Sequence, residues 1–385
     1  MSEKINQPVI KILHIILALN RGGIETWLMH LLRLQRPNIQ FDFIVFQKGQ
    51  MDEEAQSLGA TIHYLPFRYP VILRHKKELT KIISENKYDV IHYHGSIFSG
   101  IITKIATKYE TPVQIIHAHN TQYCGKRFFI NTVKEIYRQL IDIPQLDNYK
   151  TILLACSQEA GRFYFGKLWK NKKPYEMVYC GIPLEPFDTV IDYDKRKKLC
   201  EYFNIPNDAI VIGTFGRLSY QKNHEFLINV FAELAKRNQQ YTLFIGGEGD
   251  LRPILERQIQ KLNLLDRVFL PGSCSNVPEL LCQLLDVFVL PSHFEGLPVT
   301  TIEAAAAGLH SVCSDSITNE MFQFMPERVT WRNLSDPISK WCDAIEIGIK
   351  KRTSPQEGIT CLKKTPFEIN KSMDVLLYYY NKNKK

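Results

Sequence analysis

Short apolar or β-branched runs alternate with longer amphipathic stretches along most of this chain. The short runs are typical of buried strands, and the longer stretches repeat their apolar residues at the spacing of a helix. This alternation predicts parallel sheets, because parallel neighbours need a crossover between them. The first series of predicted strands covers residues 11–19, 41–46, 61–65, 89–92, 113–117, 151–155 and 177–179. Predicted helices between them include 25–34, 76–86 and 98–108.

A second series of predicted strands covers residues 209–215, 241–245, 267–270, 286–290 and 310–313. The two series are separated by residues 181–207, a charged and proline-containing segment without a strand period. A chain of 385 residues is also too long for one ordinary core. We therefore predict two doubly wound α/β domains, 1–182 and 183–365, with a cleft between them. The terminal helix, 366–385, is a candidate for packing back on the N-terminal domain.

The composition, 45% hydrophobic and 23% charged, is that of a globular protein. No stretch reaches the roughly 18 apolar residues that a spanning helix needs, and the N-terminus lacks a clear secretory signal. The nine cysteines show no metal-binding spacing, and their odd number argues against a closed disulfide framework. We expect a cytoplasmic protein with reduced, mostly buried thiols and no zinc site at the cysteines.

The net charge of +8 is concentrated in the first half of the chain. Residues 1–180 hold 24 Lys and Arg against 15 Asp and Glu, whereas the remainder holds 24 against 25. Such a surface suits anionic lipid, nucleic acid or a phosphorylated substrate, although a solvated basic face gives the same count. The basic residues are not interleaved with aromatics in a recognisable nucleic-acid module, so we expect no nucleic-acid partner.

Two loops at the ends of predicted strands carry groups that suit a phosphate. Gly22 and Gly23 join the first strand to a helix, whose N-terminus attracts an anion. The third glycine of a dinucleotide fingerprint is missing, which argues against an NAD oxidoreductase. In the second series, Arg217 and Lys222 follow a strand and precede a helix. Two cations at strand ends beside a cleft suit a diphosphate, with a solvated loop as the alternative.

The stretch LPSHFEGLPVTTIEAAAAGLH places two carboxylates eight residues apart. Glu295 lies in a loop after a strand, and Glu303 lies in the first turns of the helix that follows. Carboxylates accept hydrogen bonds from hydroxyls, and the amides of Gly296 and Leu297 near the helix N-terminus suit a phosphate. Together with the cationic loop, these groups predict a nucleotide-sugar site. Ordinary exposed carboxylates are the alternative.

The motif GR-x4-KN, followed by PS-x2-EGLP-x4-EA-x-A-x-G, resembles the donor signature of the retaining glycosyltransferases of family four. The segments RGGIETWLMHLLR, FDFIVF, YDVIHYHGS, IIHAHNT and YQKNHEFLINVFAEL are similar to the capsule and exopolysaccharide branch of that family. The resemblance covers roughly residues 10–330. It implies the GT-B fold, in which two Rossmann-like doubly wound domains face a central cleft.

The resemblance implies a role for each of the four charged candidates. Arg217 and Lys222 would hold the donor diphosphate and stabilise its charge as it leaves, so no metal or other cofactor is required. Glu303 would bind the ribose, and Glu295 would bind hydroxyls of the transferred sugar. Arg217, Lys222 and Glu295 are therefore predicted to be catalytic groups, and Glu303 to be a substrate-binding one.

The resemblance also implies contacts from the backbone. The amides of Gly296 and Leu297 would bind the distal phosphate, and Gly22 and Gly23 would line the cleft near the donor phosphate and the acceptor. The triplet at 192–194 spells D-x-D, the metal motif of the other glycosyltransferase fold. It lies in the charged linker rather than at a strand end, so we interpret it as a coincidence.

Four histidines stand at the ends of two predicted strands, His92 and His94 in IHYHG and His117 and His119 in IIHAHN. A lone strand histidine usually only packs, but α/β proteins bind ligands at strand carboxyl ends. Side chains alternate along a strand, so each pair shares a face. The family's cleft histidine follows the fifth strand, which matches His119 best and His117 next. It would contact the transferred sugar and help the acceptor attack, with His94 near the acceptor.

By resemblance, the predicted activity is that of a retaining, metal-independent transferase of the hexosyltransferase type. It would move a sugar from a nucleotide sugar to a saccharide acceptor in the synthesis of a cell-surface polysaccharide. UDP is the commonest donor nucleotide in the family. Two alternatives remain: a nucleotide-sugar epimerase of the same fold, and a non-catalytic protein that only binds a nucleotide sugar.

The basic first half fits an acceptor carried on a lipid diphosphate at the inner face of the cell membrane. Peripheral attachment would combine basic residues with the apolar side chains of a predicted helix, 128–140. The basic residues are Lys76, Lys77, Lys126, Arg127 and Lys134, and the apolar ones are Phe128, Phe129, Ile136 and Leu140.

Overall fold

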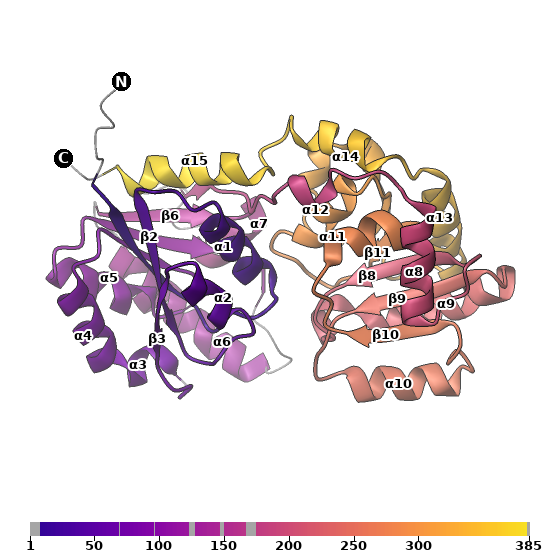
Figure 1. The fold of residues 1–385 in the computed structure, drawn as a ribbon. Coiled ribbons are helices and arrows are strands. Elements are labelled where there is room, and N and C mark those ends of the chain that lie inside the picture. Colours follow the sequence, from indigo (N-terminus) through magenta and orange to yellow (C-terminus); the bar gives the residue numbers. More distant parts are fainter. Residues whose placement is uncertain are drawn as a thin grey trace, which may run out of the picture. The chain divides into compact units, whose positions relative to one another are not determined.

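The chain forms two compact units in a computed structural model (Figure 1). One unit consists of Met1–Cys180 with Ile369–Lys385, and the other of Gly181–Glu368. The structure describes residues 8–68, 70–95, 97–122, 128–146, 150–166 and 175–382.

The first unit is built on a seven-stranded parallel sheet in the order β3-β2-β1-β4-β5-β6-β7. Its strands are β1 (Ile10–Ile15), β2 (Ile39–Val45), β3 (Thr61–Tyr64), β4 (Val90–Tyr93), β5 (Val113–Ala118), β6 (Thr151–Ala155) and β7 (Glu176–Met177). Its helices are α1 (Gly23–Arg33), α2 (Asp52–Ser57), α3 (Val71–Arg74), α4 (Lys76–Asn86), α5 (Ser99–Lys108), α6 (Phe128–Tyr137), α7 (Gln158–Phe165) and α15 (Ile369–Tyr380).

The second unit is built on a six-stranded parallel sheet in the order β10-β9-β8-β11-β12-β13. Its strands are β8 (Ile210–Phe215), β9 (Tyr241–Gly246), β10 (Val268–Gly272), β11 (Val287–Leu290), β12 (Ser311–Ser314) and β13 (Val329–Arg332). Its helices are α8 (Tyr193–Phe203), α9 (His224–Arg237), α10 (Arg252–Lys261), α11 (Val277–Glu279), α12 (Val299–Ala306), α13 (Ile338–Lys350) and α14 (Pro355–Leu362).

Helices cover the faces of both sheets, so the central strands are buried along their whole length. Every residue of β4, β5, β6, β9 and β11 is buried, which explains why their sequences are mainly apolar. His92 on β4 and Gln114 and His117 on β5 are among the buried polar exceptions. In each sheet the strand order reverses direction at one point, between β1 and β4 in the first unit and between β8 and β11 in the second. Ligands of doubly wound sheets bind outside the carboxyl ends of the strands at such a point.

Three local predictions from the sequence differ from the structure. The first strand ends at Ile15 rather than at residue 19, and Leu17 in the loop beyond it is 50% exposed. The predicted helix 128–140 is α-helical only to Tyr137 and then continues as a π-turn over Arg138–Asp142. The short strand β13 was not predicted, and all four of its residues are only partly buried.

The segment 181–207 is not the irregular linker that its sequence suggested, because it contains α8. Asp192 is the N-cap of this helix, and its carboxylate accepts hydrogen bonds from the backbone amides of Asp194 at 2.9 Å and Lys195 at 3.2 Å. Capping by Asp is a common helix start. The first aspartate of the D-x-D triplet therefore has a structural role.

Within the part of the chain that the structure describes, no helix is long and apolar enough to cross a membrane. Eight cysteines are free thiols, six of them buried. The ninth, Cys124, lies outside the described residues.

Candidate functional site

The second unit brings the predicted donor residues together in two loops, one after β8 and one after β11. Arg217 lies two residues after the end of β8 and is exposed. Lys222 ends a short 3₁₀ turn that leads into α9. Glu295 lies in the loop between β11 and α12. Because β8 and β11 are neighbours in the sheet, their carboxyl-end loops lie side by side.

Glu295 is a buried carboxylate, with 6% of its surface exposed. It forms an ion pair with Lys222, whose Nζ lies 2.8 Å from Oε1. The Ser292 hydroxyl donates to the same oxygen at 2.8 Å, and the Gln221 side-chain amide donates to Oε2 at 3.0 Å. The alternative of an ordinary exposed carboxylate is therefore wrong for Glu295.

Further hydrogen bonds hold the two loops against each other. The backbone amide of His293 donates to the Gln221 carbonyl at 2.8 Å, and the Asn223 side-chain amide donates to the Pro291 carbonyl at 3.1 Å. A third loop, after β9, approaches the first one closely. At Gly247, where φ is +149°, a Cβ atom would lie 2.0 Å from the Gly216 carbonyl oxygen, so only glycine fits.

Glu303 extends from the second turn of α12 and is partly buried. Burial raises the pKa of this carboxyl to about 7, and the nearby Lys222 ammonium partly opposes the shift. A carboxyl whose pKa is raised by burial beside a cation is a functional-site candidate. Gly296 and Leu297, the two predicted phosphate-binding positions, are buried just before α12 begins.

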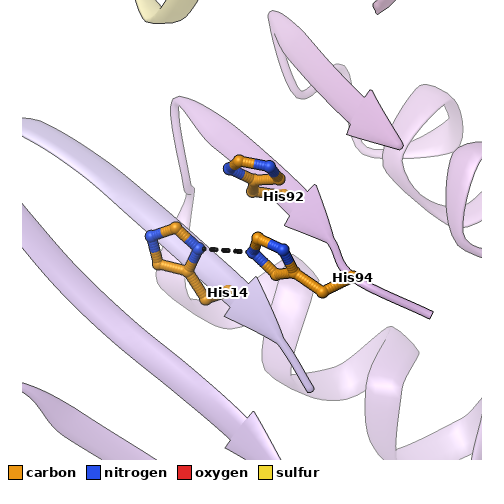
Figure 2. Close-up of side chains that lie close together, drawn as sticks. All are labelled: His14, His92 and His94. Atoms are coloured by element: carbon orange, nitrogen blue, oxygen red, sulfur yellow. Dashed lines mark hydrogen bonds between the residues drawn. The ribbon is translucent and has the colours of Figure 1, made fainter. Parts of the chain in front are cut away.

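The first unit places its four predicted histidines together, with a fifth that the sequence did not single out. His14 on β1 pairs in register with His92 on β4. His94 follows β4, while His117 and His119 lie at the end of β5 and just beyond it. Figure 2 shows the rings of His14, His92 and His94 side by side at the ends of β1 and β4.

These rings, which we call the histidine cluster (His14, His92, His94, His117 and His119), are all buried and linked by hydrogen bonds. His94 contacts His14 through Nε2 at 3.0 Å and His119 through Nδ1 at 2.9 Å. His92 contacts His117 at 3.2 Å and the Tyr380 hydroxyl of α15 at 3.1 Å. Trp27 of α1 packs against His94, His117 and His119 with ring centroids 5.6–6.4 Å apart.

Burial lowers the pKa of His14 and of His119 to about 3, and it holds the pKa values of His92, His94 and His117 well below the ordinary value. The rings are therefore neutral at physiological pH. Gly22 and Gly23 lie in the same unit at the start of α1, with Gly22 as the N-cap. A Cβ atom at Gly22 would come within 2.4 Å of the Glu25 carboxylate, the mobile end of a side chain that could move aside.

Three contributors to these sites were not predicted. Gln221 and Ser292 donate hydrogen bonds to Glu295. Their positions inside the two donor motifs were the sequence signal that could have identified them. His14 joins the histidine cluster because β1 and β4 are adjacent. A doubly wound order puts the first strand beside the fourth, so the topology could have identified it.

Two protein-family models match the chain. The model described as Glycosyltransferase Family 4 covers residues 21–186, and the model described as Glycosyl transferases group 1 covers residues 195–322. Each model matches the main part of one structural unit.

Several named proteins are similar to the chain. EpsF of Bacillus subtilis is 32% identical over 98% of this chain and 97% of its own length. The capsular polysaccharide biosynthesis glycosyltransferase CapH of Staphylococcus aureus is 25% identical, covering 77% of this chain and 79% of its own. The UDP-Gal:alpha-D-GlcNAc-diphosphoundecaprenol alpha-1,3-galactosyltransferase of Escherichia coli is 28% identical over 80% of this chain and 79% of its own.

Among solved structures, Anabaena HepE in complex with UDP-glucose matches with a TM-score of 0.76 at 16% identity, covering 96% of this chain and 98% of that one. The glycosyltransferase WaaG matches with a TM-score of 0.72 at 12% identity, covering 97% of this chain and 99% of that one. These likenesses confirm the predicted GT-B fold with two Rossmann-like units. With both family models matched and a 32%-identical relative along nearly the whole chain, the protein belongs to the family-four glycosyltransferases.

Proposed function

We propose that this glycosyltransferase moves a hexose from a UDP-sugar to a saccharide carried on a lipid diphosphate, with retention of configuration, during synthesis of a cell-surface polysaccharide. The observation that carries the proposal is the grouping of Lys222, Glu295 and Glu303 around the carboxyl ends of β8 and β11. An ammonium group, a buried carboxylate and a carboxyl with a pKa near 7 meet there. A diphosphate flanked by hydroxyls would be complementary to this set.

The named relatives support the choice of substrates. HepE was crystallised with UDP-glucose. The name of the Escherichia coli relative specifies a UDP-galactose donor and a sugar on diphosphoundecaprenol as acceptor. CapH is named for capsular polysaccharide biosynthesis. The proposal transfers the donor nucleotide and the acceptor class to this chain, but not the individual sugar.

In the proposed mechanism the second unit stabilises the leaving diphosphate without a metal. Lys222 and the exposed Arg217 face its negative charge, and the amides of Gly296 and Leu297 bind its distal phosphate. Glu303 accepts hydrogen bonds from the ribose hydroxyls. Glu295 accepts them from the transferred sugar, which requires it to exchange part of its contact with Lys222, Ser292 or Gln221 for the ligand.

The first unit contributes the acceptor side. His119 is the group proposed to contact the transferred sugar, and among the described residues its Nδ1 has no hydrogen-bond partner. His94 and His117 contact its ring, and Gly22 and Gly23 give the backbone close access at the start of α1. The acceptor hydroxyl attacks from the face that the diphosphate leaves, and the departing phosphate oxygen takes its proton.

Donor binding is testable by thermal shift. We expect a UDP-sugar at about one hundred times its dissociation constant to stabilise the second unit by about 2.7 kcal/mol and raise its melting temperature by about 5–10 °C. GDP-sugars, ADP-sugars and NAD should not shift it. The Glu303→Ala variant should lose the shift, because its ribose contact is gone. A matched control, Glu201→Ala on the exposed side of α8, should keep it.

The same preparation separates transfer from its alternatives. A transferase releases UDP only when a lipid-linked saccharide is present, whereas an epimerase converts the donor sugar without an acceptor. A protein that only binds the nucleotide sugar would show the increase in melting temperature but would release no UDP with any acceptor. If no nucleotide sugar shifts the melting temperature even with a lipid-linked saccharide present, the donor site is wrong.

A peripheral membrane contact is proposed for α6 and the π-turn after it. Val133, Ile136 and Leu140 are 51%, 54% and 71% exposed at helical spacing, which makes an unpartnered apolar stripe within the described part of the unit. Lys76 and Lys77 of α4 are exposed, whereas Lys134 is partly buried. The side chains of Lys126, Arg127, Phe128 and Phe129, which the sequence also suggested, lie outside the described residues.

Vesicle co-sedimentation checks this contact. Each apolar side chain buried in the interface contributes about 1.5–3 kcal/mol, so the double substitution Ile136→Asp, Leu140→Asp should weaken binding to anionic vesicles by roughly 100-fold or more. Ile347→Asp, at a 48% exposed position on α13, is the control. Binding that is indifferent to salt, to anionic lipid content and to the double substitution would rule the contact out.

A further inference from the structure

The histidine cluster concentrates imidazole rings in a way that packing alone does not require. Five rings come from β1, β4 and β5 and lie at the carboxyl ends of these strands. His92 and His94 are 4.1 Å apart between ring centroids, and His117 and His119 are 4.0 Å apart. His14, His92 and His117 are fully buried, and His94 and His119 are 9% and 7% exposed. The strand order reverses between β1 and β4, and doubly wound sheets bind ligands at such a point.

Three of the rings are arranged like the ligands of a metal ion. His14, His92 and His94 each offer a ring nitrogen, and these three atoms lie within 4.8 Å of one another. The facing pair, His14 Nδ1 and His94 Nε2, is 3.0 Å apart (Figure 2). Nitrogens bound tetrahedrally to Zn²⁺ at about 2.0–2.1 Å stand about 3.4 Å apart. For an ion to bind between His14 and His94, these two rings need to move apart by only a few tenths of an ångström.

The chemistry of the three donors limits which ions could bind, because all three are imidazole nitrogens. Imidazole ligands suit Zn²⁺, Cu²⁺, Ni²⁺ and Fe²⁺, whereas Mg²⁺ and Ca²⁺ prefer oxygen.

Two of the three rings have a hydrogen bond that could serve as an outer-shell contact, whereas Nε2 of His14 has no partner among the described residues. Ligating histidines usually use their second ring nitrogen in a hydrogen bond that fixes the ring. His94 has such a contact from Nδ1 to His119 Nε2 at 2.9 Å, and His92 has one from Nδ1 to the Tyr380 hydroxyl at 3.1 Å. His92 Nε2 lies 3.2 Å from His117 Nδ1 and would exchange that contact for the ion. A second possible set, His94, His117 and His119, shares one ring with the first. It includes the two rings that the proposed function places at the sugar.

We propose that His14, His92 and His94 bind one divalent transition-metal ion of the Zn²⁺ class. The ion would be a fixed part of the first unit, and the diphosphate would still be stabilised by the second unit as proposed above. The bound ion would also fix the tautomers of His94 and His119. With Nε2 of His94 on the metal, the His94 proton sits on Nδ1 and is donated to Nε2 of His119. Neutral His119 then carries its own proton on Nδ1, the nitrogen without a partner among the described residues.

The test uses the full chain, stripped with a chelator and titrated with Co²⁺, whose visible absorption reports tetrahedral nitrogen ligation. We expect one equivalent of Co²⁺ per chain, displaced by Zn²⁺, and no binding of Mg²⁺. The variants His14→Ala and His94→Ala should weaken binding by more than the roughly 10- to 100-fold that the loss of an outer-shell partner costs. Tyr380→Phe, which removes only such a partner, should fall within that range.

The matched control is His63→Ala, a partly buried histidine on β3 of the same sheet that contacts Tyr88 instead. It should bind Co²⁺ like the parent. Circular dichroism of each chelator-treated variant separates lost ligands from lost folding, and His14→Asn replaces His14→Ala if the latter is unfolded.

Failure of the unsubstituted chain to bind Co²⁺ or Zn²⁺ overturns the site, as does binding that survives both His14 and His94 substitutions. The thermal shift caused by the UDP-sugar reports on the second unit. It therefore tests the donor site independently of this result.

Discussion

Substituting Lys222 by methionine should lower the turnover number for transfer by roughly 100- to 1,000-fold. This is the usual cost of removing one preorganised group that faces a charge developing in the transition state. Methionine keeps the length and apolar stem of lysine and removes only the ammonium. The measurement is UDP release at saturating donor and acceptor. The exposed Lys350→Met substitution on α13 serves as a control that should leave the turnover number unchanged.

The same substitution has a separate effect on stability, because it leaves the Glu295 carboxylate buried without its cation. Losing one partner of a buried ion pair costs about 3–5 kcal/mol. Ser292 and Gln221 still donate to Glu295, so the lower end of that range is expected. Adding Glu295→Gln removes the stranded charge and should restore most of the lost stability, while transfer stays slow.

A double-mutant cycle over Lys222→Met and Glu295→Gln therefore separates the two roles of Lys222. Denaturant unfolding gives the coupling energy of the pair, and UDP release gives the catalytic effect. If Lys222→Met unfolds more easily but transfers at the parental rate, the lysine is only a structural cation. In that case Arg217 and the amides before α12 must stabilise the phosphate alone.

Much of the fold could be predicted because buried parallel strands and amphipathic helices leave strong periodic signals. The predicted strand 151–155 coincides with β6, and the predicted helix 76–86 coincides with α4. The missed helix α8 has no such signal, since Cys200 is its only buried residue. It is held instead by the Asp192 cap and by an ion pair of Arg196 with Asp286 at 2.8 Å. Polar anchoring of this kind leaves no apolar period in the sequence.

The candidate site also has parts that could be predicted from the sequence and parts that could not. The two donor loops could be predicted to form one site, because each of them follows a strand and contains a recognisable motif. The Lys222–Glu295 pair could not be predicted, because it depends on β8 lying beside β11 across 73 residues of sequence. His14 carries no motif of its own, and it is found only when the doubly wound strand order is used to place β1 beside β4 and His92.

The second large effect is expected at Glu303, where function and stability oppose each other. Burial raises the pKa of this carboxyl to about 7 from an ordinary value of 4.5. Between these two pH values the unfolded chain has lost a proton that the folded chain still holds, so stability falls as pH rises through the window. Above pH 7 both states are ionised and the full cost, about 3 kcal/mol, persists. Glu303→Gln removes that charge.

The Glu303→Gln variant should therefore be more stable than the parent at pH 8, by up to about 3 kcal/mol, and equally stable at pH 4. Denaturant unfolding of both proteins across this range gives the comparison.

The same variant should bind the UDP-sugar roughly 10- to 100-fold more weakly at pH 8, because hydrogen bonds to a charged group are worth about 1.5–3 kcal/mol. Parental affinity should decline below pH 7 as the carboxylate is protonated, whereas the variant should show no such step. A variant that is neither more stable at pH 8 nor weaker in donor binding would mean that Glu303 is not a buried ligand of the donor. A gain in stability with unchanged affinity would keep the buried carboxyl but remove it from the ribose. If both effects appear together, the protein retains a destabilising charge in α12 because the donor needs it there.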